Sequence, residues 1–212
     1  EGFLSPGTTM RLFDFDRAPN PRRVRIFLAE KQLDIPRVNV NLYRREQLSP
    51  EFLAINPGGT VPVLETDDGT FLTECVAICR YLDHLQPQPA LFGGNPRQEA
   101  LTLMWANIVE NDGLFAIAEV LRDLSPGFRD HVLPGPVPYP QIPALVARGG
   151  QRTEQFFDRV EQQLLKNQHL AGGDAVAREC LRPGARKRDL ADRRGALRIL
   201  ELERSLGKLE HG

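Results

Sequence analysis

The sequence contains little cysteine and no extended apolar run. Its three cysteines, Cys75, Cys79 and Cys180, form neither a disulfide framework nor a zinc-binding pattern, which indicates a reducing compartment. No stretch approaches the roughly 18 apolar residues that span a bilayer, and no signal-peptide pattern is present. We therefore expect a cytoplasmic protein without a membrane partner.

An excess of charge of one sign is also missing. The 27 lysines and arginines are balanced by 28 aspartates and glutamates, giving a formal net charge of -1, so there is no general attraction to nucleic acid. The sequence also lacks a cluster of metal-ligand residues and a phosphate-binding glycine loop. We therefore expect no metal, no nucleotide cofactor and no nucleic-acid partner.

Short alternating and helical patterns fill the first part of the chain. Helices are predicted between the first two strands, from Pro50 with Ser49 as its cap, and after Thr73 as a cap. The first connection predicts a parallel pair, and a tight turn at residues 67–69 predicts an antiparallel pair. The order β-α-β-α-β-β-α therefore predicts a mixed four-stranded sheet covered by helices. The predicted strands are residues 11–15, 37–41, 61–65 and 70–72.

Strand patterns end at residues 87–96, a linker rich in proline and glycine. The proline-rich stretch 125–143 predicts a loop or a broken helix, and the rest of the second half is predicted to be all helical. Met10 stands directly before the first strand, so residues 1–9 are expected to be a tag or an upstream segment. Helical patterns occupy residues 97–122, 151–168 and 185–209.

Two joined motifs carry a family resemblance. Residues 56–64 read Asn-Pro-Gly-Gly-Thr-Val-Pro-Val-Leu, and residues 72–78 read Leu-Thr-Glu-Cys-Val-Ala-Ile. Together with residues 19–31, which look like the family's first helix, they resemble the glutathione transferase family of the bacterial type. The resemblance implies an α/β thioredoxin-like N-terminal domain, residues 10–86, followed by an all-α C-terminal domain, residues 97–212.

The resemblance becomes poor beyond Gly173. There, an arginine-rich tail stands where the family usually has an apolar central helix, and arginines with a proline do not suit a buried helix. The helical domain is therefore expected to be atypical after residue 173. We interpret the tail as a frameshifted or unusual variant, with a basic nucleic-acid-binding tail as the alternative.

The resemblance implies that glutathione is bound by Thr60, Val61, Pro62, Glu74 and Cys75. A cis Val61–Pro62 bond would let the Val61 backbone pair with the cysteinyl part of glutathione, although proline in an edge strand is the alternative. Glu74 and the Cys75 amide would bind the γ-glutamyl group at a helix start, unless Glu74 only favours the helix dipole. Thr60 replaces a family lysine or glutamine, which predicts weaker binding.

The reactive chemistry depends on two further expectations. Cys75 at a helix N-terminus suggests a thiol of lowered pKa that forms a mixed disulfide with glutathione, with an inert small residue as the alternative. Ala18 stands where the family's serine stabilises the glutathione thiolate, and alanine cannot donate a hydrogen bond. Asn20 is therefore the predicted catalytic residue, unless it only caps the first helix. Arg22 and Arg23 could supply positive charge to the site.

The predicted function is a transferase that conjugates or exchanges glutathione, its co-substrate, with a small hydrophobic electrophile in detoxification. Asn107, Glu110 and Asn111 could face the glutathione cleft, and apolar residues of the same helix would line the electrophile pocket. Because Ala18 and Thr60 depart from the family, a binding or regulatory module with little turnover is the alternative. A thioredoxin-type oxidoreductase is less favoured because no Cys-x-x-Cys motif begins the first helix. The resemblance also implies a homodimer.

Overall fold

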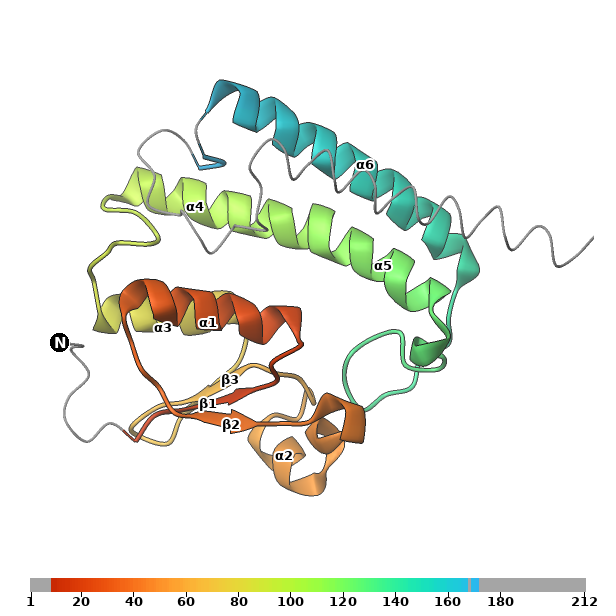
Figure 1. The fold of residues 1–212 in the computed structure, drawn as a ribbon, viewed down its shortest axis with the longest axis horizontal. Helices are drawn as coiled ribbons and strands as arrows, with labels where there is room; N and C mark the ends of the chain where they lie inside the picture. Colours follow the sequence, from red (N-terminus) through yellow and green to blue (C-terminus); the bar gives the residue numbers. More distant parts are fainter. Residues whose placement is uncertain (1–8, 168, 172–212) are drawn as a thin grey trace, which may run out of the picture. The chain divides into compact units, whose positions relative to one another are not determined.

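The computed structural model describes residues 9–167 and 169–171 of the chain, and its first half is built on a four-stranded sheet (Figure 1). The strand order is β2-β1-β3-β4, with β1 parallel to β2, β1 antiparallel to β3, and β3 antiparallel to β4. The predicted mixed sheet is therefore confirmed. The strands are β1 (Arg11–Asp14), β2 (Arg37–Asn39), β3 (Val63–Glu65) and β4 (Phe71–Leu72).

Helices cover both faces of this sheet because successive strand residues point to opposite sides. Leu12 belongs to the core beneath α1 (Pro19–Lys31) and α3 (Cys75–Leu85), whereas its neighbour Phe13 packs with Phe52 of α2 (Pro50–Ile55). Figure 1 shows α1 and α3 side by side on one face and α2 on the other. The thioredoxin-like arrangement is thus formed by two apolar layers.

Local signals set some helix ends correctly and one wrongly. The Ser49 hydroxyl accepts a hydrogen bond from the Phe52 amide at 3.2 Å, so Ser49 caps α2 as predicted. Thr73 does not cap α3; the N-cap is Glu74, which adopts a left-handed backbone conformation with φ 64°. The chain therefore turns one residue later than the sequence pattern indicated.

The second half of the described chain is helical, as predicted. One continuous helical run is formed by α4 (Pro96–Ile108), the π-helical η3 (Val109–Leu114) and α5 (Phe115–Leu124). It packs on α6 (Pro143–Lys166), which begins earlier than the predicted residue 151. Three short 3-10 helices complete the elements: η1 (Leu42–Arg44), η2 (Glu46–Leu48) and η4 (Pro126–Phe128).

Close glycine contacts explain how tightly α6 lies against this run. A β-carbon on Gly149 would stand 2.8 Å from the Ala116 carbonyl, and one on Gly113 would stand 2.7 Å from the Phe156 ring. The residues of α5 that face α6 are consequently buried, among them Ala116 and Val120.

A buried lysine ties the end of α3 to α1. The Lys31 ammonium has no exposed surface and lies 2.5 Å from the Asp83 carboxylate. It also donates to the carbonyls of Gln86 at 2.6 Å and Pro89 at 2.5 Å. This contact fixes the start of the segment that leads into the helical half.

Some expectations remain without a test. The domain boundaries at residues 86 and 97 stay predictions. The predicted tag at residues 1–9, apart from Thr9, the predicted helix at 185–209 and the tail after residue 173 lie outside the described residues. Within the described part of the chain, no helix combines the length and the apolar character that crossing a bilayer requires.

Candidate active site

A buried asparagine shapes the turn that precedes β3. The Asn56 side chain is only 6% exposed, and its Nδ2 donates to the carbonyl and the hydroxyl of Thr60 at 2.9 and 3.0 Å. Its Oδ1 accepts from the Gly58 amide at 3.0 Å. The turn leads into Val61 and Pro62, whose peptide bond is cis, as the family resemblance implied. The Asn56 amide therefore holds the segment on which three of the predicted glutathione contacts lie, Thr60, Val61 and Pro62.

In the sequence, Asn56 stands at the start of the family motif, but no role was predicted for its side chain. The available signal was an asparagine at the head of a Pro-Gly-Gly turn, since such side chains bond neighbouring backbone groups. Thr60 is part of the same network, because its hydroxyl already accepts a hydrogen bond from Asn56.

The start of α3 opens onto a cavity of about 320 Å³. No side chain caps the first-turn amides of α3, and Glu74, which precedes them, is exposed. Unpaired amides at a helix N-terminus attract a carboxylate. The cavity is lined by residues of two segments: Glu74, Cys75 and Val76, and opposite them Leu103, Ala106, Asn107 and Glu110.

Two of the three polar residues expected at the cleft lie there. Asn107 and Glu110 line the cavity, whereas Asn111 is not among the lining residues, and its Nδ2 donates to the Asn107 carbonyl at 2.9 Å. Arg23, expected to supply positive charge, lies 3.6 Å from the Glu110 carboxylate. Arg22 is exposed. The cavity wall therefore carries an acidic pair, Glu74 and Glu110, of which Glu110 is offset by an arginine.

The structure argues against a reactive Cys75. Burial raises the pKa of the Cys75 thiol to about 12; nearby Arg23 lowers it, while Glu110 and Glu74 add to the rise. The thiol donates to the Asn20 carbonyl at 3.3 Å. The prediction of a lowered pKa was wrong because α3 places this side chain inside the core, where desolvation outweighs the helix N-terminus. Cys75 instead links the beginnings of α1 and α3.

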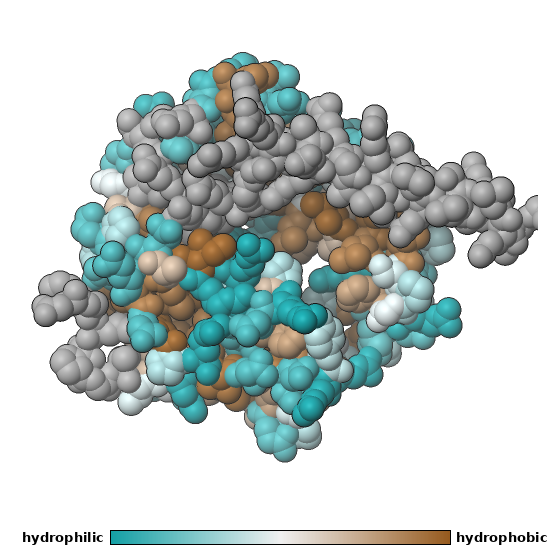
Figure 2. Space-filling view, viewed as in Figure 1, coloured by the Kyte–Doolittle hydropathy of each residue, from teal (hydrophilic) through white to brown (hydrophobic). Residues whose placement is uncertain are grey.

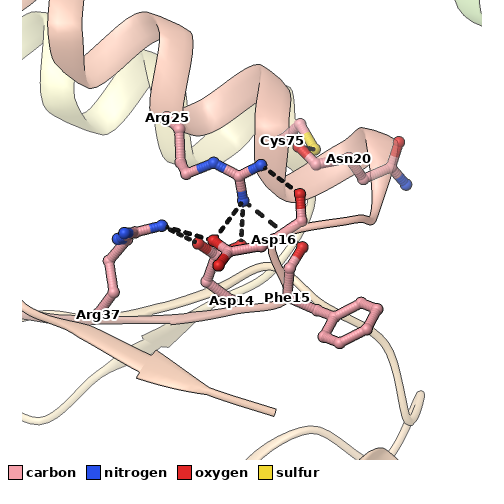
Figure 3. A network of polar contacts seen from close by, with 7 residues as sticks. All are labelled: Asp14, Phe15, Asp16, Asn20, Arg25, Arg37 and Cys75. Atoms are coloured by element: carbon pink, nitrogen blue, oxygen red, sulfur yellow. Dashed lines mark hydrogen bonds and ion pairs between the residues drawn. The ribbon is translucent and has the colours of Figure 1, made fainter. Parts of the chain in front are cut away.

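The predicted catalytic residue, Asn20, lies in the first turn of α1. The N-cap of this helix is Ala18, which makes no side-chain capping bond, so the alternative that Asn20 caps α1 is wrong. The Asn20 side chain is exposed, and Figure 3 shows it pointing away from the neighbouring ion pairs. Its role as a donor to the glutathione thiolate stays a prediction.

A network of ion pairs orders the loop between β1 and α1 (Figure 3). Asp14, only 2% exposed, pairs with Arg25 at 2.6 Å and with Arg37 at 3.1 Å. Arg25 Nη2 also donates to the Asp16 carbonyl at 2.8 Å. Because a charge-assisted network loses stability when one partner moves, these contacts hold the loop that presents Ala18 and the start of α1.

No group of three or more histidine, cysteine, aspartate or glutamate side chains suited to a metal ion occurs among residues 9–167 and 169–171. The described site offers four kinds of group. They are the uncapped amides of α3, the carboxylates of Glu74 and Glu110, the backbone at the cis Val61–Pro62 bond and the exposed side-chain amide of Asn20. Such a site suits a ligand with peptide-like groups and an ammonium–carboxylate end.

Comparison with known proteins identifies the family that this chain resembles. The family description "Glutathione S-transferase, N-terminal domain" matches residues 18–85. The chain is 40% identical over 125 residues to glutathione S-transferase 2 of Saccharomyces cerevisiae. The alignment covers 58% of this chain and 54% of that relative. It is 43% identical over 93 residues to maleylacetoacetate isomerase of Pseudomonas aeruginosa, covering 43% and 44%. The chain thus spans about half the length of the curated relatives it matches.

Solved structures cover more of the chain. The crystal structure of Gtt2 from Saccharomyces cerevisiae superposes with a TM-score of 0.71 at 32% identity, and the match covers 81% of each chain. The similarity therefore extends over both the sheet and the helices that follow it. The chain belongs to the glutathione S-transferase family.

Proposed function

We propose that the protein is a glutathione transferase, which joins glutathione to a small hydrophobic electrophile and acts in the cytoplasm as a homodimer with a role in detoxification. The observation that carries this proposal is the cavity at the α3 N-terminus, where Glu74 precedes uncapped amides. A γ-glutamyl group brings a carboxylate and an ammonium, and this end of the cavity offers amides for the first and a carboxylate for the second.

Each binding residue has a specific task in this proposal. The α3 amides, including that of Cys75, bind the γ-glutamyl carboxylate, and Glu74 accepts from the ammonium. The backbone of Val61, before the cis bond to Pro62, pairs with the cysteinyl part. Thr60 offers only a hydroxyl towards the glycine carboxylate, so that end of glutathione is held weakly.

In the reaction, the glutathione thiol loses its proton to solvent, and the thiolate sulfur attacks an electrophilic carbon. A carbon–sulfur bond forms while the leaving group departs with its bonding electrons. Asn20 donates a hydrogen bond to the thiolate and favours its formation, and positioning supplies the remainder of the rate enhancement. With an unsaturated electrophile, the same addition followed by loss of glutathione gives isomerisation, the activity in the name of the Pseudomonas relative.

A second candidate is a glutathione-binding regulatory module with little turnover. Ala18 at the N-cap of α1 supplies no hydroxyl, and this observation favours the module. Binding of glutathione is common to both candidates, so only turnover separates them.

Calorimetric titration with glutathione and a turnover assay with 1-chloro-2,4-dinitrobenzene test the proposal. Glu74→Gln should weaken glutathione binding about tenfold or more, because a hydrogen bond to a charged group contributes roughly 1.5–3 kcal/mol. Glu154→Gln, an exposed carboxylate on α6, is the matched control and should bind like the unmodified protein. An unchanged affinity in Glu74→Gln would refute the assigned site, and turnover of the chlorodinitrobenzene would exclude the regulatory module.

A further inference from the structure

We propose that Arg122 on α5 binds a carboxylate of the electrophile, so that this transferase acts on electrophiles with an apolar body and an acidic group. The inference rests on the proposed function for its reaction, and its evidence comes from α5 and from the loop that follows it.

The first observation is that Arg122 lacks a carboxylate partner in the described part of the chain. Four other arginines in that part of the chain are also partly buried, and each of them forms an ion pair with an aspartate or glutamate carboxylate. Among the described residues, the Arg122 guanidinium makes one hydrogen bond, from Nη1 to the Val132 carbonyl at 3.4 Å, which is long for an N–H···O bond. The guanidinium fork therefore retains donors for a planar anion. The four paired arginines are Arg23, Arg25, Arg80 and Arg152.

The guanidinium of Arg122 is partly buried, so it has lost part of its hydration without gaining a carboxylate partner among the described residues. Desolvation by burial lowers the pKa of Arg122 below its usual range, and no acidic neighbour opposes the change. Such a group is destabilised while it is empty and gains most from an incoming carboxylate. Exposed arginines, such as Arg129 on the following loop, have no comparable gain because water already solvates them.

The second observation is the face of the helix on which Arg122 lies. The residues of α5 that contact α6 are Ala116 and Val120, and both are buried. At about 100° per residue, Arg122 lies well away from that stripe. Leu121, which directly precedes Arg122 and is exposed, also lies well away from that stripe. Arg122 therefore lies beside Leu121 on the part of α5 that faces away from α6.

The loop after α5 supports this placement. Val132, which accepts the bond from Arg122, precedes Gly135 by three residues. A β-carbon on Gly135 would stand 3.1 Å from the Gly58 carbonyl, in the turn that leads to the cis bond at Pro62. The segment bound by Arg122 therefore reaches the sheet half beside the proposed glutathione site.

Apolar side chains occupy the interval between the cavity and Arg122. Ile117 and Leu121 are 41% and 51% exposed, and Leu114 is partly buried. Figure 2 shows hydrophobic surface in this region of the helical half. An aromatic or aliphatic body would cover these side chains, and its acidic group would then meet Arg122.

Two glutathione conjugates separate this inference from simple apolar binding. S-(4-carboxy-2-nitrophenyl)glutathione carries the acid, and the corresponding carboxamide has the same shape without the charge. By calorimetry, the carboxylate should bind roughly 10- to 100-fold more tightly, as expected for a charge-assisted hydrogen bond. Equal affinities of the two conjugates for the unmodified protein would overturn the inference, whatever any variant does.

Variants then assign the preference to Arg122. In Arg122→Gln, the affinity for the carboxylate conjugate divided by that for the carboxamide conjugate should fall to about one. The affinity for the carboxamide conjugate and the melting temperature should stay unchanged. Arg122→Lys, which keeps the charge but loses the fork, should give an intermediate ratio. Arg129→Gln is the control and should keep the full preference. A ratio that survives in Arg122→Gln would refute the assignment.

Turnover distinguishes this inference from the proposed function. With 4-chloro-3-nitrobenzoate or its amide, the glutathione sulfur displaces chloride from the ring, and chloride release is measured. Turnover without any acid preference would contradict only the role of Arg122. An Arg122-dependent preference in binding, with no chloride release from either compound, would contradict only the transferase.

Discussion

Replacing Lys31 by methionine should destabilise the protein more than other single lysine changes. Methionine keeps the length and apolar stem of lysine but removes the ammonium, which lies 2.5 Å from Asp83 and donates to two backbone carbonyls. The Lys31 side chain has no exposed surface, and that of Asp83 is only 9% exposed. Water therefore cannot replace the lost charge.

The expected cost follows from these partners. Removing one member of a buried ion pair costs about 3–5 kcal/mol, because the other charge is left without compensation. Arg80 remains 3.3 Å from the second Asp83 oxygen and offsets part of this loss, so we expect about 3 kcal/mol. For a chain of this size, such a change lowers the melting temperature by roughly 6–12 °C. The double variant Lys31→Met/Asp83→Leu also removes the unpaired carboxylate. About half of the lost free energy of unfolding should then be recovered, because the carbonyls of Gln86 and Pro89 still lack their donor.

Urea unfolding followed by tryptophan fluorescence measures both variants, because Trp105 is the single tryptophan and is buried. Lys166→Met, at the exposed end of α6, is the matched control and should change stability by less than about 0.5 kcal/mol. A loss below about 1 kcal/mol in Lys31→Met, or no recovery in the double variant, would show that the buried ion pair does not stabilise the fold as argued.

Two further variants test the site. Asn20→Ala should raise the pKa of the thiol of bound glutathione by roughly one to two units, followed by ultraviolet absorbance of the thiolate, and an unchanged pKa would remove Asn20 from the reaction. Cys75 should resist alkylation at pH 8 in the native protein and react on unfolding, since burial raises its pKa from 9.0 to about 12. The folded state keeps this proton while the unfolded state loses it, so the stabilising contribution of Cys75 is complete below pH 9 and is lost between pH 9 and 12. Relative to Cys75→Ala, the unmodified protein should therefore lose more stability across that window, and parallel curves would contradict the buried-thiol assignment.

Local patterns were sufficient for most of the fold. Alternation in β1, the Ser49–Pro50 helix start and the turn before β4 each depend on neighbouring residues, and each was predicted from them. The start of α6 was missed because Gly149 and Gly150 weaken its helical pattern. Gly149 is present for a different reason, the close approach of α6 to the Ala116 carbonyl, which only the packed structure reveals.

The site was harder to predict because its properties depend on segments distant in sequence. The rule that a helix N-terminus lowers a thiol pKa is local, and it failed at Cys75 because burial by the surrounding core outweighs it. Asn56 lies in the family motif, but the role of its side chain depends on the turn that closes around it. Arg122 belongs to no motif, and its role depends on the absence of a carboxylate near its guanidinium among the described residues.

The charges of the site affect how its activity should be assayed. Glu74 and Glu110 line the cavity, and Arg122 lies further along the same helical run, with the apolar residues Leu114, Ile117 and Leu121 between Glu110 and Arg122 in sequence. A neutral chloronitroarene uses only the apolar part and leaves the guanidinium without a partner. Slow turnover of such a compound is therefore expected both for a regulatory module and for a transferase that prefers acidic electrophiles. Only a matched acid and amide, compared in the unmodified protein and in Arg122→Gln, separates the two, because a regulatory module releases chloride from neither compound.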